Sequence, residues 1–171
     1  SDACFDLWLR IPGWCERHTI TVNGEVVQVE GKAGYAVLAR TWHSGDMVEL
    51  VMEMPVRLTE AHPYIEENRG CLALCRGPIV YCIEQVDHTA DIRALRLNSD
   101  SEFTPRYQPD LLGGVVVLEC DGIALNIEQW EGNLYLPASK LDKSPARLKA
   151  IPYAAWDNRE AGAMRVWIPK D

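Results

Sequence analysis

The chain has 171 residues, a formal net charge of −8 and no cluster of Lys and Arg. A nucleic-acid partner is therefore not expected, because a phosphate backbone attracts basic surfaces. No stretch approaches the roughly 20 consecutive apolar residues of a membrane span, so no membrane partner is expected either. Hydrophobic residues make up 47% of the chain and charged residues 25%, which is typical of a globular protein with a sizeable core.

The six cysteines form an even set, but a chain of this length and hydrophobicity does not need disulfides in order to fold. We expect free, mostly buried thiols in a reducing compartment, which favours the cytoplasm and leaves the disulfide state open. The first fifteen residues, SDACFDLWLRIPGWC, contain neither the basic nor the apolar region of a signal peptide. A strand pattern begins there almost at once, as it would in a fragment of a longer protein.

Alternation with a period of two dominates the first half of the chain. In Phe5–Ile11 the odd positions are apolar and form a buried face, which leaves Trp8 on the polar face with Asp6 and Arg10. Asn23-Gly24 separates two such runs and predicts a hairpin, because both turn positions tolerate positive φ. Strands are expected over residues 5–11, 19–22, 25–29, 35–42 and 48–54.

The second half is less regular. Strands are expected over residues 71–75, 79–84, 115–120 and 163–168. The polar, turn-rich region 87–110 is expected to be a long excursion with short strands. No stretch of ten or more residues has an apolar repeat of 3.6, although a short helix within Ser139–Lys149 is possible. The sequence therefore predicts an all-β fold, an antiparallel β-sandwich or jelly roll with little helix.

Two segments are expected along the chain. Residues 1–58 form a first β-sandwich segment that is incomplete without upstream chain, and residues 59–171 form a second β-sandwich domain. About sixty residues are marginal for a two-layer sandwich, so the first segment should share a core with the second or with upstream polypeptide. The residues expected in the core are Trp42, Leu50, Val117 and Trp167.

The stretch GCLALCRGPIVYCIE, residues 70–84, contains three cysteines and raises the question of a metal site. Cys71-x₃-Cys75 has a spacing found in zinc knuckles, but the intervening Leu-Ala-Leu is typical of a strand. In a strand the two thiols would lie about 13 Å apart along one face. Cys82 lies beyond the Gly77-Pro78 break, on another strand. All three are therefore expected to be structural cysteines of a buried sheet.

Other possible ligands and catalytic carboxylates are expected to be surface residues. His62, Glu66 and Glu67 lie in a polar connection. A pair such as Glu128 and Glu131 would suit glycoside hydrolysis only if the two carboxylates faced each other across a cleft, about 5–9 Å apart. The chain contains no nucleophile elbow, phosphate loop or HExxH motif. No catalytic, cofactor-binding or metal-binding residue is assigned.

Four of the six tryptophans are candidates for a contact surface. Trp8 is on the polar face of its strand, and Trp14, Trp130 and Trp156 lie in or beside loops. An exposed indole offers a flat apolar surface that suits a neighbouring domain or the face of a sugar. Packing in a core or against another domain is the favoured role of these residues, and a sugar platform is the alternative.

Six motifs in order resemble one known family. They are LWLRIPGWC (7–15), TVNGE (21–25), GYAVLARTWHSGDMVEL (34–50), MPVR (54–57), LCRGPIVYCIE (74–84) and AIPYAAWDNREAGAMRVWI (150–168). Together they resemble the C-terminal region of glycoside hydrolase family 127, the β-L-arabinofuranosidase family, and the resemblance covers nearly the whole chain except residues 87–110. The chain departs from the family pattern at Tyr153-Ala154-Ala155-Trp156, where a second aromatic residue beside the tyrosine is expected.

The resemblance implies an (α/α)₆ barrel followed by β-sandwich domains. It also implies retaining glycoside hydrolysis by a cysteine nucleophile, held on zinc by a glutamate and further cysteines. Those ligands belong to the barrel and include a Cys-Cys step that is absent from this chain. No catalytic residue is therefore carried over, and no cofactor is expected in this chain, because zinc would be held only in the barrel.

The resemblance favours a non-catalytic C-terminal β-sandwich region, inactive by itself, whose parent protein is a glycoside hydrolase. Its expected partners are its own upstream catalytic barrel or a second copy in a homodimer. The alternative is a carbohydrate-binding module that holds a glycan on its loop tryptophans. A free-standing enzyme is a third interpretation. The sequence does not define the sugar, the linkage or the oligomeric state.

Overall fold

The computed structural model describes residues 2–138 and 141–171. The chain forms two compact units, residues 1–55 (unit 1) and residues 56–171 (unit 2). The boundary inferred from sequence, after residue 58, lies within a strand of unit 2, β7 (Val56–Glu60). Among the described residues, none of the helical turns has the length and hydrophobicity needed to cross a lipid bilayer.

Unit 1 consists of two antiparallel sheets of three strands, ordered β1–β5–β4 and β3–β2–β6. Both sheets contribute to one hydrophobic core, with Ile20 and Val22 from one sheet and Leu38 and Trp42 from the other. The strands are β1 (Ala3–Arg10), β2 (His18–Val22), β3 (Glu25–Val26), β4 (Glu30–Lys32), β5 (Tyr35–Trp42) and β6 (Val48–Met52).

The hairpin predicted at Asn23-Gly24 is confirmed. Asn23 has a φ of 54° and Gly24 a φ of 83°, and β2 pairs with β3 on either side of them. Positive φ at both central residues is the geometry of a type I′ turn, whose twist matches that of the flanking strands.

The alternation predicted for β1 is confirmed for Leu7 and Leu9, which pack against the core, and for Trp8, which is exposed. It is wrong for Phe5, whose side chain is 49% exposed although it stacks on the Trp42 ring at 5.6 Å. The reason is that Phe5 lies beside an open groove. Leu50, also expected in the core, is only half-buried.

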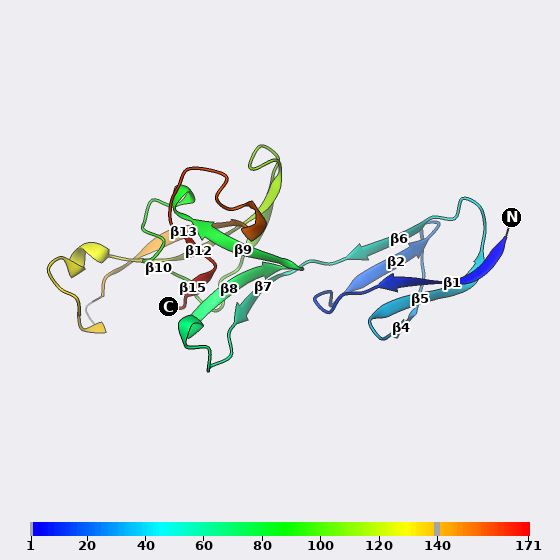
Figure 1. The fold of residues 1–171 in the computed structure, drawn as a ribbon, viewed down its shortest axis with the longest axis horizontal. Coiled ribbons are helices and arrows are strands. Elements are labelled where there is room, and N and C mark those ends of the chain that lie inside the picture. The colour runs from blue at the N-terminus through cyan, green and yellow to red at the C-terminus, as the bar shows by residue number, and fades with distance from the viewer. Residues whose placement is uncertain (1, 139–140) are drawn as a thin grey trace. The chain divides into compact units, whose positions relative to one another are not determined.

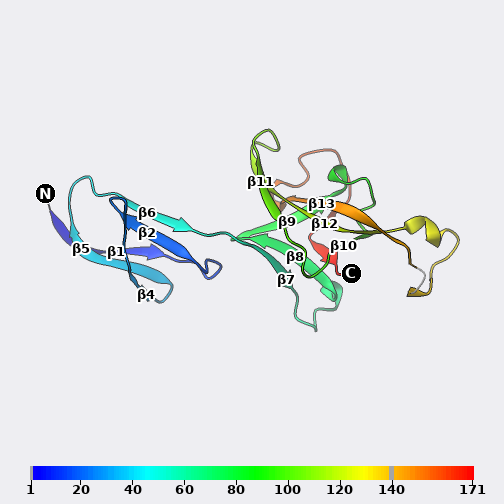
Figure 2. The ribbon, with the colours of Figure 1, turned by 180° about the vertical axis from the view of Figure 1, so that it is seen from behind.

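Unit 2 is one curled sheet of nine strands (Figures 1 and 2). Its main path runs β10–β12–β13–β9–β8–β15, with β11 on β12, β14 on β9 and β7 on β8. After β7 the strands are β8 (Cys71–Arg76), β9 (Ile79–Glu84), β10 (Leu95–Arg96), β11 (Thr104–Gln108), β12 (Val115–Leu125), β13 (Lys143–Pro152), β14 (Met164–Arg165) and β15 (Trp167–Pro169). Among the described residues, four short 3₁₀ segments lie between the strands: η1 (Glu66–Asn68), η2 (Gln85–Asp87), η3 (Ile127–Trp130) and η5 (Tyr153–Ala155).

The two ends of this sheet bond to each other. The Leu97 amide donates to the Pro169 carbonyl at 3.0 Å, and the Asp171 amide donates to the Leu97 carbonyl at 2.9 Å. These bonds link Leu97, which follows β10, to the end of β15 and the residues after it, so the ends of the main path are joined. Closure satisfies backbone groups that an open sheet edge would leave bare.

The central strands of the unit 2 sheet carry a buried cluster on each face. Leu118 and Leu148 belong to the larger core, whereas their neighbours Val117 and Ile151 belong to a second cluster on the opposite face. The core position predicted for Val117 is therefore confirmed. Trp167 was expected in the core but is half-buried; its neighbour Ile168 is the fully buried residue of β15, because adjacent strand positions point to opposite faces.

The region 87–110 contains short strands, as expected, and these are β10 and β11. Its polar composition did not reveal that Ile92, Leu95 and Leu97 are fully buried in the larger core. The Gln85 side chain fixes the start of this region, since it donates to the His88 and Ala90 carbonyls and accepts from the Ile92 amide.

The short helix considered within Ser139–Lys149 is wrong for the described part of that range, because β13 begins at Lys143. Residues 139 and 140 lie outside the described residues. Lys143–Pro152 is a strand because its apolar positions pair with β12 and fill the core.

Truncating Leu148 should test how much the two-sided sheet depends on its core. Leu148→Ala should lower the free energy of unfolding by roughly 2–5 kcal/mol, because the cavity that it leaves is surrounded by fully buried neighbours. Leu134→Ala is the matched control: that side chain is 85% exposed, and its loss should change stability by less than about 0.5 kcal/mol. Equal effects of the two substitutions in urea unfolding would contradict the core assignment.

Candidate functional site: aromatic surfaces and a buried ion network

Trp8 lies in an exposed group of aromatic and basic side chains on the outer face of the β1–β5–β4 sheet. Tyr35 of β5 pairs with Arg10 of β1 on one side and with Lys32 of β4 on the other. The Trp8 and Tyr35 rings meet edge to face at 6.0 Å, and Trp8 is 46% exposed. The Lys32 ammonium lies 5.6 Å from the Trp8 ring centre, and the Arg10 guanidinium 5.3 Å from that of Tyr35. We call these four residues the Trp8 patch.

The other three candidate tryptophans are half-buried. Trp14 lies in the turn after β1, where the Cys15 amide donates to the Pro12 carbonyl. Trp130 ends η3 in the connection from β12 to β13, and Trp156 follows η5 after β13. Because β13 has ten residues at about 3.3 Å each, Trp130 and Trp156 lie at opposite ends of the hairpin, about 30 Å apart. These two cannot belong to one small ligand site.

The segment that carries Trp130 is a projecting arm, residues 126–138, visible at the end of the sheet in both views (Figures 1 and 2). Leu134 and Tyr135 are 85% and 89% exposed. The base of the arm is held by two hydrogen bonds, from the Gln129 amide to the Asp142 carboxylate at 2.6 Å and from the Asp142 backbone to the Gln129 side-chain oxygen at 2.8 Å. The arm thus presents large apolar side chains on a fixed base.

Trp156 is next in the chain to a residue that contacts a buried ion network. Its indole packs against the cluster that contains Cys82 and Val117, and the Tyr153 ring stacks on it at 6.2 Å. The residue that follows, Asp157, has a φ of 61°, and its amide donates to the Glu84 carboxylate at 3.2 Å. This bond ties the 153–157 loop to β9.

Arg159 bridges the two acidic side chains of this network. Its guanidinium bonds Glu84 and also bonds Asp87 in two places, at 2.6 and 2.9 Å. Lys149 adds a bond to Asp87 at 3.0 Å. Burial alone would raise the pKa of Asp87, but the hydrogen bonds from Arg159 and Lys149 outweigh it and lower that pKa. The hydrogen bonds from Arg159 to Asp87 and Glu84 raise the pKa of Arg159, so Arg159 and Asp87 form a charged pair at neutral pH.

His88 lies beside this network as a neutral ring. The Lys149 backbone amide donates to His88 Nε2 at 3.1 Å, so that nitrogen carries no proton. Nδ1 lies 2.7 Å from the Glu84 carbonyl oxygen, so it carries the proton and donates it. Burial lowers the pKa of His88, against opposing contributions from the Glu84 bond and the Asp87 charge. Both ring nitrogens are used to hold β9 to β13.

The cysteines of residues 70–84 are placed as structural residues. Cys82 is fully buried, and burial raises its pKa to about 12, while Cys71 and Cys75 are half-buried on β8. Cys15 and Cys120 are buried and Cys4 is exposed, and all six thiols are free. Within residues 2–138 and 141–171, no group of three or more His, Cys, Asp or Glu side chains is arranged to hold a metal ion.

The groupings of polar residues considered from sequence are on the surface. His62, Glu66 and Glu67 are exposed, and Glu66 pairs with Arg69 at 3.4 Å. Glu128 and Glu131 are exposed on the arm. None of these observations places two carboxylates across a cleft.

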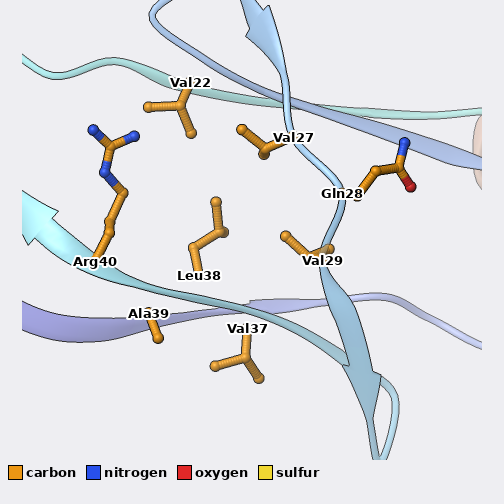
Figure 3. Close-up of a pocket in the computed structure, with 8 residues that line it drawn as sticks. All are labelled: Val22, Val27, Gln28, Val29, Val37, Leu38, Ala39 and Arg40. Atoms are coloured by element: carbon orange, nitrogen blue, oxygen red, sulfur yellow. The ribbon is translucent and has the colours of Figure 1, made fainter.

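A groove of about 450 Å³ in unit 1 has an apolar centre (Figure 3). The side chains of Val22, Val27, Val29 and Leu38 point toward one another, and the polar residues on its lining are Gln28 and Arg40. With no carboxylate, thiol or imidazole on its lining, this groove is an opening into the core and not a catalytic cleft.

Comparisons with known proteins agree with this arrangement. Residues 56–169 match the family model described as the glycoside hydrolase family 127 C-terminal domain. Residues 1–54 match the family model described as the β-L-arabinofuranosidase GH127 middle domain. The chain belongs to glycoside hydrolase family 127. It corresponds to the middle and C-terminal domains of that family and not to its catalytic barrel.

The similar proteins are much longer than this family 127 chain. A non-reducing end β-L-arabinofuranosidase of Bifidobacterium longum subsp. longum is 34% identical over 98% of the chain, which spans 26% of that protein. A solved GH127 β-L-arabinofuranosidase from Geobacillus stearothermophilus T6 superposes with a TM-score of 0.92 at 42% identity, over 100% of this chain and 27% of its own. A solved GH127 β-arabinofuranosidase superposes with a TM-score of 0.86 at 34% identity, and the match covers 100% of this chain and 28% of that protein.

Removing Arg159 should leave two buried carboxylates without their counter-ion. Arg159→Met should therefore lower the free energy of unfolding by roughly 3–5 kcal/mol in urea denaturation at pH 7. Arg147→Met is the matched control: Arg147 also bonds two acidic residues, Asp121 and Glu119, but it is exposed. Its loss should have a much smaller effect. An Arg159→Met protein as stable as Arg147→Met would show that the network does not hold the loop.

The neutral state of His88 should make stability fall on acidification. Its pKa is lowered in the folded state, so the folded chain binds fewer protons than the unfolded chain below about pH 6.5. The stabilisation is therefore complete above the unfolded pKa and decreases as pH falls from about 7 to 5. Urea denaturation at several pH values in this range measures it, and His88→Gln should remove this part of the pH dependence. An identical pH profile for the variant would refute the assignment.

Proposed function

We propose that this chain is a non-catalytic accessory region of a β-L-arabinofuranosidase-type glycoside hydrolase, and that it packs against the catalytic portion of the same protein. The observation that carries the proposal is its correspondence to the middle and C-terminal domains of family 127 in proteins about four times as long. We also propose that the isolated chain does not hydrolyse glycosides.

The distribution of chemical groups supports an accessory role. The buried ion network pairs two carboxylates, Glu84 and Asp87, with two cations, Arg159 and Lys149. The pKa of Asp87 is lowered, away from neutral pH. A general acid or base works best with a pKa near the working pH and within reach of substrate. Zinc, in this proposal, is held by residues outside residues 1–171.

Two surfaces supply the proposed contacts. The Trp8 patch and the apolar side chains of the arm expose large aromatic and aliphatic groups, Trp8, Tyr35, Leu134 and Tyr135 among them. Exposed apolar surfaces of this kind are typical of interaction sites. The catalytic portion is the proposed partner, and contact with a second copy is the other use that these surfaces would allow.

A carbohydrate-binding module is the second candidate function. The observation in its favour is the adjacent exposed rings of Trp8 and Tyr35. Against it, Lys32 and Arg10 already lie over those rings, where a sugar would have to stack. Free thiols on all six cysteines further support a reducing compartment such as the cytoplasm.

The test compares acrylamide quenching of tryptophan fluorescence in this chain and in the full-length protein. In the chain, Trp8→Phe should reduce the quenchable fraction, because Trp8 is exposed. In the full-length protein the same substitution should leave that fraction unchanged, because the partner covers Trp8. Trp42→Phe is the control, since the Trp42 indole is buried in both.

A Trp8 that stays equally accessible in the full-length protein would count against this surface as the contact. Protection of Trp8 in the isolated chain by arabino-oligosaccharides would favour the binding module instead. Turnover of a chromogenic β-L-arabinofuranoside by the isolated chain would disprove the non-catalytic role.

A further inference from the structure

The two sheets of unit 1 end in unpaired strands on the same side. β1 is the last strand of one sheet and β6 the last strand of the other. A groove of about 600 Å³ opens there, lined by Ala3, Phe5 and Leu7 of β1, by Val48 of β6, and by the end of β5 and the β5–β6 connection, which add polar side chains such as His43 and Asp46. The two free edges therefore border one opening.

The outer amides of β1 can be identified from its pairing with β5. The Ile11 amide donates to the Gly34 carbonyl, which fixes Ile11 and Gly34 as a hydrogen-bonded pair. In an antiparallel pair, bonded and non-bonded positions alternate. The amides of Cys4, Asp6 and Trp8 therefore point away from β5, along the free edge.

The same argument applies to β6. The Asn23 amide donates to the Met47 carbonyl, so Asn23 and Met47 form a bonded pair. By alternation, the backbone groups of Val48, Leu50 and Met52 point away from β2. Each edge thus offers a row of unpaired donors and acceptors at every second residue, as a template for another strand.

The groove between the edges exposes part of the unit 1 core. Phe5 is 49% exposed, and Leu7, Val48 and Leu50 are only half-buried although all three pack against the core. Unit 2 lacks such an opening at the ends of its main sheet, because bonds between Leu97 and the β15 segment join them. Unit 1 therefore combines unpaired edges with uncovered core side chains in one place.

We propose that the β1/β6 side of unit 1 is a docking site for a β-strand supplied by the polypeptide that precedes residue 1 in the full-length protein. This inference rests on the proposed function only in taking the chain to be part of a longer polypeptide. The strand would bond the outer amides of β1 or β6 and place every second side chain, of apolar type, into the groove against Phe5.

The preceding polypeptide is the occupant that fits best. The chain covers only 26–28% of its relatives, which leaves ample polypeptide outside it. Preceding residues would enter at Ala3, where the open edge begins.

Residue-resolved amide hydrogen exchange in this chain and in the full-length protein tests the proposal. In this chain the outer amides of Cys4, Asp6 and Trp8 should exchange at least about 100-fold faster than those of Leu7 and Leu9, which bond β5. In the full-length protein the outer amides should become as protected as Leu7 and Leu9.

A backbone substitution provides the second measurement. Asp6→Pro removes only an outward-pointing amide and is tolerated on an edge strand. It should leave the unfolding midpoint of this chain unchanged but reduce protection of the neighbouring outer amides in the full-length protein. Asp6→Ala keeps the amide and is the matched control, expected to change neither.

The outcomes separate this inference from the proposed function. Outer amides that stay unprotected in the full-length protein, while Trp8 becomes inaccessible to quencher, would overturn the inference and leave the proposed function intact. If the outer amides are already protected in the isolated chain, and their protection increases with concentration, the occupant is a second copy. That result would also overturn the inference. Protection only in the full-length protein, lost in Asp6→Pro, supports it.

Discussion

Burial of the β12–β13 hairpin on both faces holds unit 2 together. Leu118 and Leu148 fill one core, and Val117 and Ile151 fill the other. Because adjacent residues of a strand point to opposite faces, every strand of the hairpin belongs to both cores, and neither core can loosen without affecting the other. The bonds of Leu97 to the β15 segment close the sheet. Unit 2 thus buries both faces of its central hairpin, and joins the ends of its main sheet, with its own residues.

Unit 1 covers its own core and strand edges less completely. Its two small sheets share a core, but β1 and β6 are unpaired on one side and Phe5 is left at an open groove. The two units also differ in what they present: an aromatic and basic patch on unit 1, and in unit 2 an apolar arm and a loop held by Arg159. These are features of contact surfaces. The exposed patch and the arm are the surfaces on which the proposed accessory role depends.

Much of this fold could be predicted from sequence, because its signals are local. Alternation and Asn23-Gly24 located the strands and the hairpin of unit 1, and alternation placed Trp8 on an exposed face. The ion network could not be predicted, because Glu84 and Arg159 lie 75 residues apart and meet only through tertiary packing. Burial of Ile92 was missed because its neighbours are polar, and exposure of Phe5 because alternation cannot reveal whether a further strand covers a face.

The unequal completeness of the two units can be measured most directly with the native cysteines. Cys15 is buried in unit 1, and Cys82 and Cys120 are buried in unit 2. In equilibrium urea titrations of this chain, followed by pulsed thiol labelling and mass spectrometry, Cys15 should become reactive at a lower urea concentration than the other two. Exposed Cys4 should react throughout and serves as the internal reference. Simultaneous exposure of Cys15, Cys82 and Cys120 in a single transition would contradict the account.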